Sequence, residues 1–224
     1  MYRILFGILA FTLSSLLTQN AYSQYCPTKV AAIHGNDLSN EAIPILKNIY
    51  MKLGCSPEII YLPGRRGVSH FNKSLVDGEV FRFEIIEKKY KKEFVRSSIP
   101  MFRLASAIWQ HPSQKIADTK PMAFVWGIAW QEKFVSETPI RNSIKLHTVQ
   151  QVVDAYNNGA VGSFLAVKPT IGIFLEKQGI QPVPVLKQTI SSMHLYHYLD
   201  IKFAKFMADF SEEIRLKNQF SKLE

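Results

Sequence analysis

Residues 58–83 read EIIYLPGRRGVSHFNKSLVDGEVFRF, an alternation of apolar and polar segments. The apolar segments Glu58–Leu62 and Gly78–Phe83 have the length and the β-branched or aromatic content of strands. Pro63-Gly64 closes the first of them, and Arg66–Leu75 repeats apolar residues at helical spacing. The stretch therefore predicts a strand, a helix and a second strand, in the order of a parallel βαβ unit.

The segments before this unit extend the same alternation. Lys29–His34 predicts another strand. Asn40–Leu53 predicts a helix, with Ser39 as its N-cap. Pro44 fits only the first turn of a helix, so a later start than Ser39 is also open. Strands and helices that alternate in this way favour an α/β fold with a parallel, doubly wound sheet.

The second half of the chain alternates again, which predicts a second α/β lobe. Residues 110–121 are a polar connection. Thr148 and Gln151 have the spacing of a capping box at the start of a helix. The strands expected here are 103–109, 122–126, 160–167 and 183–186, and the helices are expected to begin near 127, 148, 169 and 192, the last of them running to 218.

The N-terminus has the three parts of a secretory signal peptide. Arg3 supplies a positive charge, residues 4–17 are mostly apolar, and Ala21-Tyr22-Ser23 has small residues where a signal peptidase cuts. The apolar run is short for a membrane-spanning helix, which makes a retained anchor the less favoured alternative. We expect cleavage after Ser23 and a periplasmic mature protein.

The composition is that of an ordinary globular protein, with 47% hydrophobic and 20% charged residues. Arg3 is the one charged residue of 1–23, so cleavage lowers the formal net charge from +9 to +8. The basic residues are dispersed, apart from a modest cluster within 88–92, and a dispersed surplus is typical of a solvated surface. We therefore expect no nucleic acid among the partners.

The chain has two cysteines, Cys26 and Cys55. In an oxidising compartment an isolated pair favours a disulfide, with two buried thiols as the alternative. Each cysteine precedes one of the first two predicted strands, and the amino ends of neighbouring parallel strands lie close together. We predict a Cys26–Cys55 disulfide, because two cysteines alone make a poor metal site.

Charged residues at the carboxyl ends of the predicted strands are the binding candidates, because open α/β sheets bind ligands there. Asp77 belongs to the turn before the third strand, Arg82 lies at its carboxyl end, and Glu79 lies between them. Arg82 suits a ligand carboxylate, or it pairs with Glu79 and braces the lobe. Arg65 and Arg66 follow the second strand at a helix start, where they either bind an anion or form a solvated cap.

A tryptophan pair is a further binding candidate. Trp126 and Trp130 flank Gly127 and, one turn apart on a predicted helix, would share a face that can stack on a planar ligand. Packing into the core is the alternative. His194 and His197 have a helical i, i+3 spacing, but no acidic or cysteine partner is near in sequence, so we expect no metal and no cofactor.

Several stretches, taken in their order along the chain, carry a family resemblance. They are Gly54-Cys55, YLPGRR at 61–66, VDGE at 76–79 with Arg82, EKKY at 87–90, WGI at 126–128 and LYHYL at 195–199. Together they resemble the extracytoplasmic solute-binding proteins of family 3, which include the amino-acid-binding components of ABC importers. More narrowly, the chain resembles a poorly characterised subgroup with a strand-DGE-x-x-R pattern, and the resemblance covers nearly all of the mature chain.

The resemblance implies a two-lobe periplasmic binding protein-like fold of the α/β class. Each lobe would be a mostly parallel sheet flanked by helices, and two strands would cross between the lobes, near 104–109 and 186–191. Lobe 1 is expected to comprise residues 24–106 plus 188–224, and lobe 2 residues 107–187.

The resemblance also bears on the ligand. In the family, an arginine after the third strand commonly holds the ligand carboxylate, and an acidic residue of the second lobe holds its ammonium group. Arg82 meets the first need, whereas residues 160–168 contain no carboxylate. The resemblance therefore implies a small anionic or zwitterionic ligand, a monomeric protein, and a membrane permease or sensor as partner.

Two other functions remain open. A degenerate binding fold that serves as a protein-interaction or signalling module would have a cleft filled by its own side chains. An enzyme on this scaffold would need an acid that faces the cleft with a raised pKa. Asp77 and Glu79 point the same way from one strand and do not straddle a substrate, so we expect no enzyme.

Overall fold

The computed structural model describes residues 25–140 and 142–223. The predicted signal peptide, residues 1–23, lies outside the described residues. Within the described part, nine strands form one sheet in the order β2-β1-β3-β9-β5-β8-β6-β7, with β4 pairing beside β9. The strands are β1 (Lys29–Ile33), β2 (Glu58–Leu62), β3 (Gly78–Phe83), β4 (Phe94–Arg96), β5 (Phe102–Gln110), β6 (Met122–Val125), β7 (Ser143–Leu146), β8 (Ser163–Val167) and β9 (Val185–Asp200). The helices are α3 (Asp37–Lys52), α4 (Gly64–Asn72), α5 (Gln114–Thr119), α6 (Ala129–Glu137), α7 (Val149–Asn157), α8 (Lys168–Ile173) and α9 (Ala204–Leu216).

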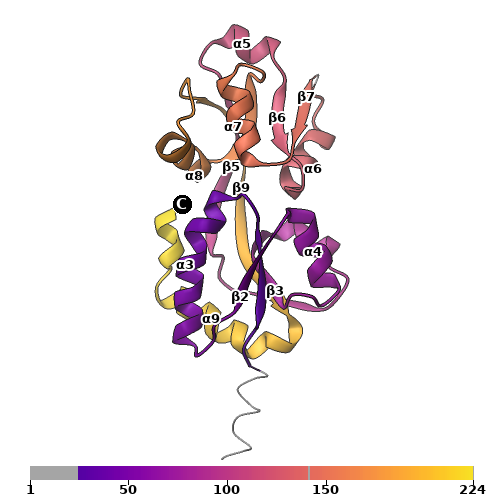
Figure 1. Cartoon of the computed structure of the whole chain (residues 1–224), viewed down its shortest axis with the longest axis vertical. Helices are drawn as coiled ribbons and strands as arrows, with labels where there is room; N and C mark the ends of the chain where they lie inside the picture. The colour runs from indigo at the N-terminus through magenta and orange to yellow at the C-terminus, as the bar shows by residue number, and fades with distance from the viewer. Residues whose placement is uncertain (1–24, 141, 224) are drawn as a thin grey trace, which may run out of the picture.

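The sheet is divided into two lobes that β5 and β9 connect (Figure 1). In lobe 1, β1 pairs in parallel with β2 and β3, and β9 runs antiparallel to β3. In lobe 2, β6 pairs in parallel with β7 and β8, and β5 runs antiparallel to β8. Each lobe is thus a mostly parallel sheet flanked by helices, as the sequence predicts.

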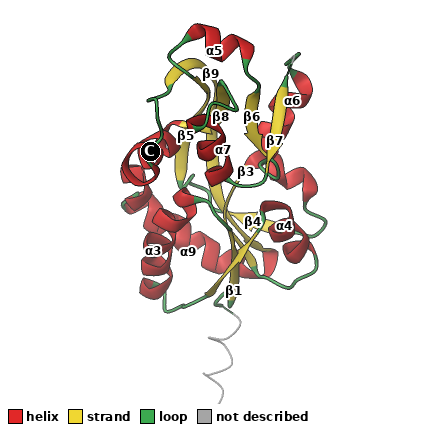
Figure 2. Ribbon diagram, turned by 45° about the horizontal axis from the view of Figure 1, so that its top comes forward, coloured by secondary structure: helices red, strands yellow, loops and turns green. Residues whose placement is uncertain are grey.

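Helices cover both faces of the lobe 1 sheet, with α3 and α4 on opposite sides (Figures 1 and 2). The reason lies in β1, whose successive side chains point to opposite faces. Val30 and Ala32 join the core beneath α3, whereas Ala31 between them packs with Phe71 of α4. All three β1 residues are buried, because this strand lies between two layers of helix.

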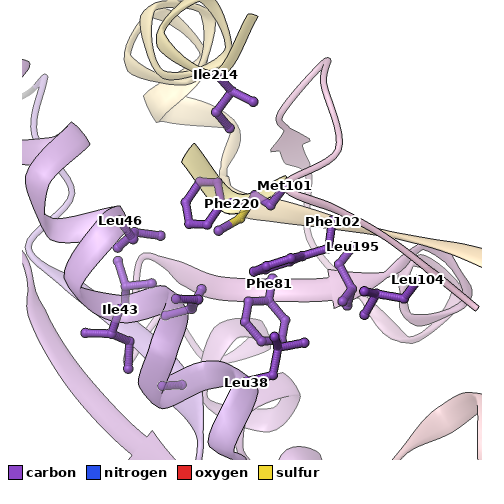
Figure 3. Packing of buried hydrophobic residues seen from close by; sticks show 14 of the residues in the cluster. Leu38, Ile43, Leu46, Phe81, Met101, Phe102, Leu104, Leu195, Ile214 and Phe220 are labelled. Carbon is purple, nitrogen blue, oxygen red and sulfur yellow. The ribbon is translucent and has the colours of Figure 1, made fainter. Parts of the chain in front are cut away.

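The lobe 1 core is built from aromatic and branched side chains that meet from distant segments (Figure 3). Phe81 of β3 and Phe102 of β5 pack edge to face with ring centroids 5.4 Å apart. Phe220, near the C-terminus, meets Phe102 at 5.3 Å, and Leu46 of α3 is fully buried beside them. Phe220, near the C-terminus, therefore packs into the same hydrophobic core as the side chains of α3 and β3.

The first helix starts earlier than the sequence predicted. Its N-cap is Asn36, whose side chain accepts a hydrogen bond from Ser39 N at 3.0 Å, so both Ser39 and a later start are wrong as helix boundaries. Pro44 consequently lies inside α3. Its ring is exposed, and water can therefore satisfy the carbonyl of Asn40 that loses its helical partner.

The predicted helix over residues 192–218 is wrong in its first half. Residues 185–200 form β9, the longest strand, which pairs with β3, β4 and β5, and the helix α9 begins only at Ala204. His194 and His197 therefore lie on a strand. Residues 110–121 likewise contain the short helix α5, where only a connection was predicted.

Other local predictions are confirmed. β2 and β3 have the predicted limits, and Thr148 caps α7 by accepting a hydrogen bond from Gln151 N at 3.1 Å. Cys26 and Cys55 form a disulfide with their Cα atoms 5.4 Å apart. The bond ties the segment before β1 to the segment before β2, as expected for two adjacent parallel strands.

Candidate functional site

Two adjoining pockets lie between the lobes. The larger, here called the outer pocket, has a volume of about 510 Å³, within the usual range for ligand sites. Four loops line it, each at the carboxyl end of a parallel strand: residues 33–36 after β1, 63–66 after β2, 125–128 after β6 and 147–149 after β7. This is the edge at which open α/β sheets hold ligands.

The smaller pocket, here called the inner pocket, has a volume of only about 80 Å³, room for a few water-sized groups. Most of its lining is apolar, and its large side chains include Phe81, Phe83, Trp130 and Phe174. Six residues line both pockets, which are therefore contiguous: Ile33, Asn36, Val125, Gly127, Ile128 and Val149. The deep part of the cleft is thus largely filled by the side chains of the protein.

Arg65 connects the two lobes across the outer pocket. From the start of α4, its Nη2 donates to Glu132 Oε1 on α6 at 2.9 Å. The same carboxylate oxygen accepts a hydrogen bond from Gly127 N at 2.8 Å. Burial would raise the pKa of Glu132, but the bonds from Arg65 and Gly127 outweigh it and lower that pKa below its usual value. Glu132 is therefore a charged anchor between the lobes.

The backbone conformation of Gly127 allows its hydrogen bond to Glu132. Its φ of +94° lies in the left-handed region, which favours glycine, and this conformation turns its N–H toward Glu132. The approach of the lobes is also close here, because a Cβ on Gly64 would lie 2.8 Å from the carbonyl oxygen of Gly127.

The two tryptophans do not form a common stacking wall. Trp126 precedes α6, whose first residue is Ala129, so the expectation that both share a helix face is wrong. Trp130 is buried and lines the inner pocket. Trp126 is 40% exposed at the outer pocket, with the Arg65 guanidinium 4.4 Å and the Lys145 ammonium 4.8 Å from its ring centroid. Its ring already stacks on cations of the protein.

Arg66 differs from its neighbour. It is exposed and lines the outer pocket, and in the described part of the chain no carboxylate pairs with it. His34 and His147, each directly after a strand end, line the same pocket. Sequence reasoning missed both histidines. His34 ends a predicted strand, so the rule that selected Arg65 and Arg66 could have found it, whereas β7, which precedes His147, was not predicted.

Arg82 is committed to an internal partner. Its Nε donates to Glu79 Oε1 at 2.9 Å, its Nη2 contacts the same oxygen, and Nη2 also donates to Gly64 O at 3.0 Å. Tyr90 Oη donates to the other oxygen, Glu79 Oε2, at 2.5 Å. Glu79 is fully buried and Arg82 nearly so, although Arg82 still touches the inner pocket. Burial, followed by the Glu79 charge, raises the pKa of Tyr90 well above its usual value, which keeps the phenol as the donor.

A second buried network lies on the core side of β9. Tyr50 Oη and His197 Nε2 are 2.6 Å apart, and His197 Nδ1 lies 2.9 Å from Glu79 O and 3.0 Å from Val80 O. A neutral ring that donates from Nδ1 and accepts at Nε2 satisfies this arrangement. Burial lowers the pKa of His197 to about 4, against the raising effect of the two carbonyl bonds.

Asp77 is a structural residue at the edge away from the cleft. Its Oδ2 accepts hydrogen bonds from Thr28 N and Thr28 Oγ1, both at 2.7 Å, and thus fixes the start of β1. Burial would raise the pKa of Asp77, but these bonds outweigh it and lower the pKa. Asp77 and Glu79 therefore have separate roles. Among the described residues no group of three or more His, Cys, Asp or Glu side chains is placed to hold a metal ion.

Comparison with known proteins gives the fold a class. The structure resembles a mutant of ArgBP from T. maritima, with a TM-score of 0.71 and 14% identity over 92% of this chain and 96% of that one. It also resembles the periplasmic VFT2 domain of BvgS from Bordetella pertussis, with a TM-score of 0.68 and 11% identity over 92% and 94% of the two chains. A histidine kinase sensor domain with similarity to periplasmic binding proteins matches with a TM-score of 0.68 and 14% identity, over 88% and 93% of the two chains. The fold is therefore that of the two-lobe periplasmic binding protein-like domains.

The sequence comparisons add no narrower assignment. No family model matches the chain. No curated protein matches it either. In the described part of the chain, none of the helices combines the length and the apolarity that crossing a bilayer requires.

Proposed function

We propose that this protein binds a small anionic or zwitterionic solute between its two lobes and presents the closed form to a membrane partner, either a permease or a sensor. The observation that carries the proposal is the outer pocket, which is large enough for a small molecule and is lined by loops from both lobes. This lining contains Arg65 and Arg66 and, among the described residues, no aspartate or glutamate, which favours a negatively charged group on the ligand.

Contacts between the lobes support closure around a ligand. Arg65 pairs with Glu132 on one side, and Lys177, after α8, pairs with Glu41 of α3 on another. We place the lobe limits at residues 24–106 plus 188–224 and at 107–187, as the resemblance implies. The register of β5 against β9 shifts between Ser106 and Ala107, an irregularity suited to a hinge.

The disulfide supports residence outside the cytoplasm, since such bonds persist in oxidising compartments. We therefore propose that the protein is exported through a cleaved signal peptide and acts in the periplasm as a monomer. Intact mass of the protein from a periplasmic extract should lack residues 1–23. Full-length chain in the membrane fraction would contradict this.

A thermal-shift screen of the mature protein against a metabolite library tests the binding function. A ligand should raise the midpoint of unfolding, because it binds the folded state alone. Small-angle scattering of the same sample should then show a smaller radius of gyration if the protein without ligand is open. The radius should stay unchanged if the protein without ligand is already closed. A library that yields no stabilising compound and no calorimetric heat would contradict the proposal.

The second candidate function is a protein-interaction or signalling module that has lost its ligand. The small inner pocket and the Arg82–Glu79 pair favour it, because the deep cleft is filled and its arginine is engaged. An enzyme is disfavoured, since Glu132, the acid that binds Arg65 and Gly127 of the outer pocket, has a lowered pKa. A failed ligand screen together with capture of a defined periplasmic domain by the intact protein would support the module.

A further inference from the structure

The charges around the two pockets are unequal. Among the described residues, neither lining includes an aspartate or a glutamate, whereas the two together include three arginines and two histidines. Two of the arginines are already neutralised, Arg82 by Glu79 and Arg65 by Glu132. Arg66 has no such partner, and it is therefore the cation that a ligand can pair with.

The two pockets also differ in polarity along the depth of the cleft. Charged and polar groups lie at the outer pocket, on the loops after β1, β2 and β7. The lining of the inner pocket is mostly apolar, with Phe81, Trp130 and Phe174 among its large side chains, and its one charged residue in the described part of the chain, Arg82, is paired with Glu79. A ligand that reaches from the outer pocket to the inner one therefore meets the unpaired Arg66 at one end and mainly hydrocarbon at the other.

An ammonium group on the ligand has no counterpart in this arrangement. Among the described residues no carboxylate lines either pocket, so the ammonium group would meet Arg66 at the outer end or the mostly apolar lining at the inner end. Burial of a charge without a partner is strongly unfavourable, and so is its approach to a like charge. A carboxylate at the outer end gains a charge-assisted hydrogen bond from Arg66.

We propose that the ligand is a small organic monoanion with an apolar or aromatic body and no ammonium group. Its carboxylate lies at Arg66 in the outer pocket, and its body lies against the apolar residues that both pockets share, among them Ile33, Val125 and Ile128, with only its tip toward the small inner pocket. This inference rests on the proposed binding function and narrows its ligand from an anionic or zwitterionic solute to an anion alone.

Three probes that share a phenyl group and a short carbon chain separate the possibilities: 3-phenylpropionate, L-phenylalanine and 2-phenylethylamine. Calorimetric titration of the mature protein should show 3-phenylpropionate binding at least ten-fold more tightly than L-phenylalanine, and no binding of the amine. Acetate supplies the anion without the body and should bind at least ten-fold more weakly than 3-phenylpropionate.

A substitution tests the anchor. Arg66→Gln should weaken binding of 3-phenylpropionate at least ten-fold, because the charge is removed while a hydrogen-bond donor stays. Arg215→Gln is the matched control, since Arg215 pairs with Glu212 on α9 outside both linings and should leave the affinity unchanged. The melting temperature of both variants without ligand shows that they are folded.

The outcomes separate this inference from the binding function itself. Equal or tighter binding of L-phenylalanine or of the amine overturns the ligand class and leaves the binding function standing. An affinity for 3-phenylpropionate that Arg66→Gln does not change overturns the anchor and with it the proposal. If none of the probes binds, the ligand class is wrong, and only an additional failure of the metabolite library removes the binding function.

Discussion

The carboxylate of Glu79 and the guanidinium of Arg82 form a buried ion pair, although the two residues are three apart on one strand. On a regular strand, residues at i and i+3 point to opposite faces. The register of β3 against β9 shifts between Glu79 and Arg82, and this irregularity brings both side chains to the same side. The irregularity in β3 thus accommodates the ion pair, which favours the bracing role for Arg82 that the sequence left open.

Substitution of Arg82 should therefore reduce stability. Arg82→Met leaves the Glu79 charge buried without its partner, and we expect the free energy of unfolding to fall by about 3–5 kcal/mol. Urea titration followed by circular dichroism measures this loss. The double variant Glu79→Gln, Arg82→Met should recover part of it, because the orphaned charge is gone. An Arg82→Met protein of unchanged stability that no longer binds ligand would instead show that Arg82 acts in recognition.

Substitution of Glu132 should loosen the contact between the lobes. Glu132→Gln removes the ion pair with Arg65, whose side chain is 55% exposed, so the effect on free energy is only about 0–1 kcal/mol. We expect up to about a five-fold rise in the ratio of open to closed forms, visible as a larger radius of gyration in scattering without ligand. Lys133→Gln is the control on the same helix, since the one ion pair of Lys133 among the described residues is with Glu137 within α6. Equal radii for the two variants would contradict a role in closure.

Loss of the disulfide should destabilise lobe 1 without changing ligand recognition. The bond joins residues 29 positions apart, for which chain entropy gives about 3–4 kcal/mol. The double variant Cys26→Ala, Cys55→Ala should lose about this much in denaturant titration and keep the calorimetric affinity of the wild type. Thiol labelling of the unreduced, denatured wild type should find no free cysteine in the mature chain, and two labelled cysteines would contradict the bond.

Acidification should destabilise the protein partly through His197. Its pKa is about 4 when folded and its ordinary value is 6.5, so below pH 6.5 the unfolded chain binds a proton that the folded protein excludes. The stabilisation is complete above pH 6.5 and is lost progressively as the pH falls from 6.5 toward 4.

From pH 7 to pH 4.5 this one group should lower the free energy of unfolding by about 2 kcal/mol. The measurement is a pair of urea titrations at the two pH values, on the wild type and on His197→Gln, which cannot titrate. The variant should lose about 2 kcal/mol less than the wild type over this interval. An identical loss in both proteins would show that His197 does not contribute.

Much of lobe 1 could be predicted from the sequence because its early elements carry local signals. β2 and β3 are bounded by Pro63-Gly64 and Asp77-Gly78, and their apolar runs are of strand length. α3 was found but its start was misplaced, because Asn36 and Ser39 are both good N-caps and Pro44 argued for a late start. Pro44 is exposed, so water can satisfy the carbonyl of Asn40 and the helix continues through the proline. Local sequence patterns do not predict the exposure of a single carbonyl group.

β9 could not be predicted because its sequence satisfies two periods at once. Leu195 and Leu199 are four residues apart, which fits a helix face, but with His197 they also fit one face of a strand. The choice depends on β3, β4 and β5, whose pairing supplies the hydrogen bonds of a strand and lies far away in sequence.

The candidate site was predictable in position but not in detail. The carboxyl-end rule selected Arg65 and Arg66, and the tryptophan pair selected the segment at Gly127; all three residues line the outer pocket. The partner of Arg65 depends on α6 presenting Glu132 to the start of α4, and the partner of Arg82 depends on the irregularity in β3. Both are properties of the assembled fold. The contrast between a basic outer pocket and an apolar inner one is likewise visible only when both lobes are in place.

The central place of β9 has a consequence for how the chain folds. Tyr50 of α3 and His197 of β9 are in contact although they are 147 residues apart in sequence. β9 lies between β3 and β5 in the sheet. A chain that emerges N-terminus first therefore carries β1, β2 and β3 with the edge of β3, and its unpaired backbone N–H and C=O groups, uncovered until almost all of the chain has appeared. Strand pairings between residues this far apart in sequence form slowly. Lobe 1, whose first strands are synthesised before lobe 2, is therefore the last lobe to complete its fold. The exposed edge of β3 in the nascent chain is therefore where a molecular chaperone would bind and where aggregation would start.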